Sequence, residues 1–226
     1  MKLILTCEHA RNMIPTEFRY LFENAQKELN SHRGFDPGAL DLFNFLKELA
    51  FFGKAQMVSR LLVEMNRSLN NPELFSEFTK LLAPEVKKEV LNTYYFPYRH
   101  SVEDAVRTQI EKGEEVLHVS VHSFVPELNG KTRDVELGLL FDPKRSSEKE
   151  FCVGLKNNLR RGSSSLHVKF NKPYLGTADG FTTCLRKKFP KNYLGIELEV
   201  NQKFVSKNKM DPYLKMQLYK VLKDSF

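Results

Sequence analysis

Two histidines, His9 and His122, each follow a stretch of sequence that is typical of a strand. Residues 116–121 (VLHVSV) carry the β-branched and apolar side chains of a buried strand, and residues 2–6 (KLILT) form a second apolar run. Each histidine therefore lies at or just past the carboxyl end of its strand, where open α/β sheets bind ligands. Because imidazole nitrogen is a common ligand of zinc, we predict that His122 binds a metal ion and that His9 joins it.

Carboxylates that could complete such a site occur in two further segments. Asp36 precedes Pro37, which is also typical of a helix N-cap followed by a first-turn proline, so a structural role is the alternative to metal binding. Glu197 and Glu199 alternate with apolar residues over 193–202, and therefore share one face of a predicted strand. Two buried carboxylates on one face need basic partners or a metal, unless that face is exposed.

The chemistry open to these residues is metal-assisted hydrolysis. A catalytic zinc site keeps one position open for water, and a nearby free glutamate can take the proton of that water. The sequence has no HExxH motif, so the helical metalloprotease arrangement is absent. Any metal site must therefore be assembled from segments that are far apart in the chain.

Composition favours a single globular domain with a small-molecule partner. The 226 residues are 41% hydrophobic and 28% charged, with a net charge of +7, which suits an anionic small substrate. The densest basic cluster, residues 186–191, is interpreted as a solvated helix end, because no nucleic-acid motif accompanies it; no nucleic-acid partner is expected. No run could span a bilayer and residues 1–6 are too short for a signal peptide, so we expect a cytoplasmic protein without a membrane partner.

The three cysteines point away from cysteine chemistry. Cys7, Cys152 and Cys184 are widely spaced and form no CxxC pair, which argues against a zinc knuckle and against a disulfide framework. Cys7 lies close to His9, but a small buried hydrophobe at a strand end is the favoured interpretation over a nucleophile.

The elements that position these residues alternate between strand and helix, which indicates a mainly parallel sheet covered on both faces. Further strands are predicted over residues 54–62, 135–141 and 166–170. Helices are predicted over residues 17–29, 37–50, 101–112, 146–160, 179–188 and 213–222, the last capped by Asp211. Residues 70–112 are predicted to contain a helical insertion, and residues 94–100 an aromatic loop.

Six segments in this order, CEHARNMIP, HRGFDPGAL, SRLLVEMNRS, VHSFVPELNGKTRDVELGLLFDP, NKPYLGTADG and YLGIELEVNQ, resemble the N-formylglutamate amidohydrolase family over most of the chain. The resemblance implies one domain over residues 1–226. It also implies a three-layer α/β/α sandwich with a mainly parallel or mixed central sheet, similar to zinc carboxypeptidases. The family's reaction is hydrolysis of N-formyl-L-glutamate to formate and L-glutamate.

The resemblance also implies roles for individual residues. His9, Asp36 and His122 match the ligands of one zinc ion, with Glu8 as the alternative ligand. Glu199 matches the general base, with Glu197 as the second candidate. The residues implied to bind the substrate or line its pocket are Arg67, Asn66, Arg60, Arg133 and Tyr174.

The sequence therefore predicts a metal-dependent amidohydrolase acting on a small N-acylated amino acid. The alternative is a non-catalytic protein that binds an anionic small molecule on the same fold. His118 lies about 13 Å before His122 on the same strand face, at ~3.3 Å per residue, so a role in the core or behind the ligands is predicted. His32, His100 and His167 are predicted to be structural or on the surface.

Overall fold

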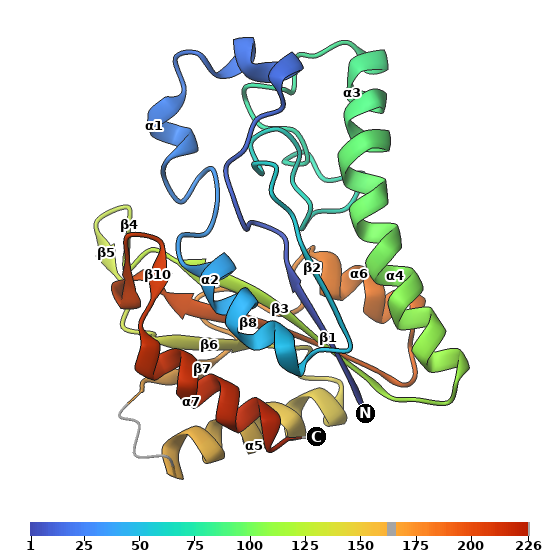
Figure 1. Cartoon of the computed structure of the whole chain (residues 1–226), viewed down its shortest axis with the longest axis vertical. Helices are drawn as coiled ribbons and strands as arrows, with labels where there is room; N and C mark the ends of the chain where they lie inside the picture. Colours follow the sequence, from blue (N-terminus) through green and yellow to red (C-terminus); the bar gives the residue numbers. More distant parts are fainter. Residues whose placement is uncertain (162–165, 226) are drawn as a thin grey trace.

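A mixed six-stranded sheet, in the order β2-β1-β3-β8-β6-β7, forms the centre of the molecule (Figure 1). The structure is a computed structural model and describes residues 1–161 and 166–225. The strands are β1 (Lys2–Cys7), β2 (Phe52–Ala55), β3 (Val116–Phe124), β6 (Leu137–Leu140), β7 (Val168–Phe170) and β8 (Tyr193–Asn201). β6 pairs antiparallel with β8 and parallel with β7, and the pairings among β2, β1, β3 and β8 are parallel. The predicted α/β class with a mixed sheet is confirmed.

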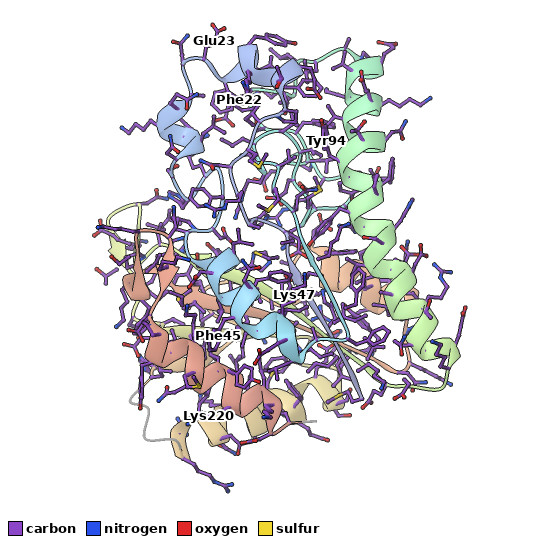
Figure 2. All side chains as sticks on the ribbon, viewed as in Figure 1. Phe22, Glu23, Phe45, Lys47, Tyr94 and Lys220 are labelled. Atoms are coloured by element: carbon purple, nitrogen blue, oxygen red, sulfur yellow. The ribbon has the colours of Figure 1, made fainter. Side chains whose placement is uncertain are left out.

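Helices cover both faces of this sheet (Figure 1). One face packs against α2 (Ala39–Leu46), α5 (Ser146–Arg161) and α7 (Pro212–Lys223), and the other against α4 (Phe96–Glu111) and α6 (Phe181–Lys188). Side chains fill the space between α2 and α7, where the rings of Phe45 and Tyr219 lie 5.7 Å apart (Figure 2). Since β3 and β8 are covered on both sides, each is buried at every position.

Shorter elements complete the chain. They are η1 (Thr16–Phe22), α1 (Gln26–Leu29), η2 (Lys47–Leu49), α3 (Pro84–Val90), η3 (Leu91–Tyr95), η4 (Gln202–Phe204) and the hairpins β4 (Glu127–Leu128) with β5 (Lys131–Thr132) and β9 (Val205–Ser206) with β10 (Lys209–Met210). Within residues 1–161 and 166–225, no helix combines the length and the apolar character needed to cross a bilayer.

Two N-terminal predictions differ from the structure. The strand predicted over residues 54–62 ends at Ala55, and only an isolated bridge between Met13 and Val58 follows it. The helix predicted over residues 17–29 is divided into a 3₁₀ helix, η1, and the short α1. Phe18, Phe22, Ala25 and Leu29 of this segment are nevertheless buried, because a core can bury such side chains without a continuous helix.

The region predicted as an insertion begins with turns and then forms one long helical segment. α3, the π-helical η3 and α4 follow one another without a break from Pro84 to Glu111. The prediction of an aromatic loop over residues 94–100 is wrong, since Tyr95 and Tyr98 are buried on this helix. Pro97 lies in the first turn of α4, where the wider π-turn directly before it accommodates a residue that has no N–H to donate.

The two predicted aspartate caps have different outcomes. Asp211 caps α7, because its side chain accepts a hydrogen bond of 2.8 Å from the Leu214 N–H. Asp36 does not cap α2, whose N-cap is Gly38 in the left-handed region at φ 81°. A Cβ at Gly38 would also lie 2.6 Å from Val205 Cγ2, so glycine is required there. The Asp36 carboxylate is therefore free to point elsewhere.

Candidate active site

Three donor atoms converge at the carboxyl ends of β1 and β3. His9 Nδ1 lies 3.3 Å from Asp36 Oδ2 and 3.2 Å from His122 Nδ1, and the remaining edge, from His122 Nδ1 to Asp36 Oδ2, is 2.9 Å. All three side chains are buried. Ligand atoms at ~2.0–2.1 Å around a tetrahedral zinc ion are separated by about 3.3–3.4 Å. The triangle formed by His9 Nδ1, His122 Nδ1 and Asp36 Oδ2 thus has nearly the size of one face of the ligand tetrahedron around zinc. Its nitrogen and carboxylate donors fit a divalent cation.

The outer ring nitrogens of both histidines face carboxylates. His9 Nε2 lies 2.5 Å from Glu64 Oε1, and His122 Nε2 lies 2.8 Å from Ser120 Oγ and 3.2 Å from Glu8 Oε2. An N–H at Nε2 that donates to these oxygens leaves the Nδ1 lone pair directed into the triangle. The surroundings of each ring therefore favour the tautomer that a metal ligand needs.

Glu8, the alternative ligand, lies outside the triangle. Its carboxylate is on the Nε2 side of His122, where it also accepts hydrogen bonds from Ser120 Oγ and from Tyr98 Oη, the latter at 3.1 Å. Burial acts to raise the pKa of Glu8, but the hydrogen bond and charge of His122 outweigh it and hold the pKa well below its usual range. The geometry therefore makes Glu8 a partner of His122, a predicted ligand, although Glu8 adjoins His9 in sequence.

Glu64 has the matching position behind His9, and the sequence did not identify it as a site residue. Burial acts to raise its pKa, but the charge of His9 and the hydrogen bond from its ring lower the pKa to about 2. The same Oε1 atom accepts the main-chain N–H of Asn66 at 2.9 Å. Fifty-five positions separate Glu64 from His9, and no local pattern connects them.

Arg60 was predicted to bind substrate, but the structure places it against the carboxylates of the site. Its Nη2 donates to Asp36 Oδ1, and its Nε lies 3.9 Å from Glu64 Oε2. Burial would raise the pKa of Asp36, but the charges of Arg60 and His9 hold it well below its usual range. Arg60 lines the cavity, yet its strongest contact neutralises a predicted ligand.

A cavity of about 210 Å³ opens beside the triangle. Its lining residues are His9, Asp36, Arg60, Glu64, Asn66, Arg67, His122, Ser123, Tyr174, Leu175, Ala178, Asp179, Glu197 and Glu199. Glu199 is the register partner of His122 across β3 and β8, and no residue in the described ranges 1–161 and 166–225 forms a hydrogen bond with its buried Oε2. Burial raises the pKa of Glu199 to about 8, aided by Asp36 and Glu197 and opposed by His122.

Two polar residues on the opposite wall hold fixed positions. Arg67 Nη1 donates to the main-chain oxygens of Asn66 and Asp179 at 3.0 and 3.1 Å. Asn66 Oδ1 accepts the Phe181 N–H at 2.6 Å, which directs the amide nitrogen of Asn66 away from Phe181. Both side chains therefore offer oriented N–H donors to the cavity.

Tyr174 lines the cavity as predicted, but Arg133 does not. Arg133 Nη1 donates to Tyr174 Oη at 3.2 Å, and its guanidinium lies 5.3 Å from the centre of that ring. The side chain thus supports Tyr174 from outside. His118 is in the core, as predicted, between Thr6 Oγ1 and Tyr193 Oη at 2.7 Å each, and burial lowers its pKa to about 4.

The family model for N-formylglutamate amidohydrolase matches residues 1–206. The chain belongs to the N-formylglutamate amidohydrolase family. Membership of this family indicates a hydrolase. A search of curated proteins finds none that matches the sequence of this family member.

Solved structures agree with the family assignment. A gene product from Agrobacterium tumefaciens superposes with a TM-score of 0.81 at 25% identity, over 99% of this chain and 90% of that one. N-Formylglutamate amidohydrolase from Ralstonia eutropha JMP134 superposes with a TM-score of 0.70 at 15% identity, over 99% of this chain and 92% of that one. At that identity the second structure shows a shared fold.

Proposed function

We propose that this family member is a metal-dependent amidohydrolase that cleaves the amide bond of a small N-acylated amino acid. The observation that carries the proposal is the convergence of His9, Asp36 and His122 on one wall of a cavity. Beside them lies Glu199, whose Oε2 has no hydrogen-bond partner in the described part of the chain. A single zinc ion is the proposed cofactor, since two imidazoles and one carboxylate are ligands typical of catalytic zinc. Such an ion supplies Lewis acidity for attack of water on an amide carbonyl.

Glu199 is the proposed general base. Among the described residues Oε2 has no hydrogen-bond partner, so the ionised form of Glu199 can accept the proton of the attacking water and return it to the leaving nitrogen. Glu197 is less suited to this task, because one of its oxygens already accepts a hydrogen bond of 2.7 Å from Thr182 Oγ1. The general-base assignment therefore rests on position and on a free oxygen atom.

Arg67 and Asn66 are the proposed binding residues for the substrate carboxylate. The carbonyls that hold Arg67 Nη1, together with Glu73 Oε2 at 3.7 Å from Nε, orient the guanidinium, and Nη2 is the nitrogen proposed to meet a ligand. Asn66 adds an amide N–H from the same wall, and Tyr174 covers the rim. An arginine fork with a neighbouring amide suits two-point binding of a carboxylate.

Metal analysis joined to a substrate screen tests the proposal. Purified protein is expected to contain or bind about one zinc ion per chain, as the donor set implies, and to hydrolyse at least one N-formyl or N-acetyl amino acid. His122→Ala should lose both properties, whereas His100→Ala, on the surface of α4, should keep both. Unchanged metal content in His122→Ala would contradict the metal site.

The alternative of a non-catalytic binding protein is not favoured by family membership. The two functions differ in the effect of Glu199→Gln. A hydrolase loses turnover in that variant but retains ligand binding, whereas a binding protein shows no turnover in either form. Single-turnover assays with stoichiometric protein would detect even slow hydrolysis.

A further inference from the structure

Glu197 is a buried carboxylate in the cavity, and no cationic side chain among the described residues pairs with it. Only 9% of the residue is exposed, and it lines the same cavity as Glu199. Its Oε1 accepts a hydrogen bond of 2.7 Å from Thr182 Oγ1. Within the described ranges 1–161 and 166–225, no ion pair involves this carboxylate. An ionised carboxylate buried in this way costs free energy unless a cation or further donors meet it.

The two arginines that line the cavity do not supply that cation. Arg60 is paired with Asp36, and Arg67 donates to two main-chain carbonyls and pairs with Glu73 at 3.7 Å. Among the ion pairs of the described residues, neither arginine meets Glu197. Asp36 thus has a positive partner, and Glu197 has none. The imbalance indicates that the missing positive charge arrives with a ligand.

The space next to Glu197 is walled by oxygen acceptors. A Cβ built on Gly180 would lie 3.1 Å from Asn66 Oδ1 and 3.2 Å from Glu197 Oε1, closer than ordinary van der Waals contact, so the glycine leaves room for these two oxygens beside each other. Asn66 cannot turn its amide nitrogen into the space next to Glu197, because the Phe181 N–H holds Oδ1 in place. Two acceptors in one recess suit an N–H donor, and a ligand carboxylate there would be repelled.

The recess lies at a defined distance from the proposed reaction centre. Glu197 and Glu199 are two residues apart on the same face of β8, which corresponds to about 6.6 Å at ~3.3 Å per residue. A substrate whose amide lies beside Glu199 can therefore reach Glu197 with a chain of a few methylene groups.

We propose that Glu197 binds a distal ammonium group of the substrate. The substrate class is then α-N-acylated amino acids with a basic side chain, of the lysine or ornithine type, and N-acylglutamate is disfavoured. This inference rests on the proposed hydrolase function, since it uses the same cavity, with Arg67 at the α-carboxylate and Glu199 at the amide. Glu197 acts in it as the specificity-determining residue.

Kinetic comparison of three side chains of similar length tests the assignment. The zinc-loaded enzyme is assayed with the α-N-formyl and α-N-acetyl derivatives of lysine, norleucine and glutamate. kcat/KM is expected to be highest for lysine, by at least about tenfold over norleucine, and lowest for glutamate. Glu197→Gln should remove the lysine preference mainly through KM, while Glu150→Gln, an exposed glutamate on α5, should keep it. A glutamate preference in the wild type, or an unchanged lysine preference in Glu197→Gln, overturns the assignment.

Binding measurements separate this inference from the proposed reaction. Zinc-loaded Glu199→Gln and the double variant Glu199→Gln/Glu197→Gln are titrated calorimetrically with the same three acetyl derivatives. Tighter binding of the lysine derivative that is lost in the double variant supports the Glu197 subsite, even when no derivative is hydrolysed by the wild type and the proposed reaction fails. Equal affinities for the three derivatives in Glu199→Gln, or no binding of any of them, would overturn the Glu197 subsite. Far-ultraviolet circular dichroism and zinc content confirm that each variant is folded and loaded.

Discussion

His122 on β3 lies directly opposite Glu199 on β8, in the parallel register of two strands that are buried along their whole length. The pairing fixes a predicted metal ligand and the proposed base on neighbouring backbones. No loop has to close to bring these two residues together. Their separation is set by the interstrand spacing of the sheet, about 4.8 Å, and is therefore insensitive to movements at the cavity rim.

Substitution Glu199→Gln should abolish most of the activity and leave the metal in place. A general base typically contributes about 10²–10⁴-fold, so kcat is expected to fall within that range. The measurement is steady-state hydrolysis of the best substrate, with zinc content measured on the same sample. Glu111→Gln, at the exposed end of α4, is the matched control. Loss of zinc together with activity would instead assign Glu199 to the metal site.

Removal of the carboxylates behind the histidines should weaken metal binding. Glu64→Gln and Glu8→Gln each replace the acceptor that faces an Nε2 atom, and such changes typically cost about 10–100-fold in metal affinity. Competition with a chromophoric chelator measures the zinc dissociation constant. If both variants bind zinc as tightly as the wild type, these carboxylates do not orient the rings.

The metal-free protein should become less stable as the pH rises through the titration range of Glu199. Its pKa is raised from 4.5 to about 8, so the folded state binds a proton that the unfolded state releases, and the stabilisation present at low pH is lost across that interval. The raised pKa of His122 acts in the same direction. The free energy of unfolding in urea should decline less in Glu199→Gln than in the wild type as the pH rises from 4.5 to about 8. Parallel pH profiles would show that Glu199 is ionised in the folded apoprotein.

Substitution Arg67→Ala should raise KM with little effect on kcat. The change removes the guanidinium that is proposed to bind the substrate α-carboxylate, and loss of such a contact is expected to raise KM by about tenfold or more. An N-acylated amine without a carboxylate serves as the internal comparison, because its kinetics should be the same in both proteins. An equal loss for both substrates would mean that Arg67 supports the fold of the cavity.

Gly38→Ala should destabilise the protein more than Gly113→Ala. Both glycines have φ of 81°, but a Cβ at Gly38 meets Val205 at 2.6 Å, whereas nothing lies within 4 Å of a Cβ at Gly113. The strained backbone costs about 1–2 kcal/mol at either position, and the collision adds to it only at Gly38. Chemical denaturation measures both free energies of unfolding. Equal values would show that Val205 moves aside without cost.

The sequence predicted the elements whose signals are local. Residues 116–121 predicted a buried strand and the alternation over 193–202 predicted a strand, although only the structure shows that both faces of the second are buried. Asp211 before Pro212 correctly predicted a capped helix. The aromatic loop predicted over residues 94–100 is instead helical, and the π-turn directly before Pro97 accommodates its missing N–H. Local rules carry no information about such compensation.

The site was less predictable, because its decisive contacts join distant segments. Asp36-Pro37 has the signature of a cap, and only the position of Gly38 in the fold shows that the carboxylate is free for the triangle. Glu64 had no local signal at all, since its partner His9 lies on another segment. Glu8 adjoins His9 in sequence, but its carboxylate lies against the ring of His122 and not against that of His9.

One oxygen atom, Glu64 Oε1, connects the predicted metal site with the proposed anion-binding residues. It contacts the His9 ring on one side and the main-chain N–H of Asn66 on the other. A ligand that tightens the Asn66 segment therefore also acts on an imidazole of the cation site. Thermodynamic linkage requires this influence to be reciprocal: whatever factor the anion adds to the affinity for the cation, the cation adds to the affinity for the anion. Binding of a cation at the predicted metal site and binding of an anion at Asn66 are therefore expected to be cooperative, because both sites contact Glu64.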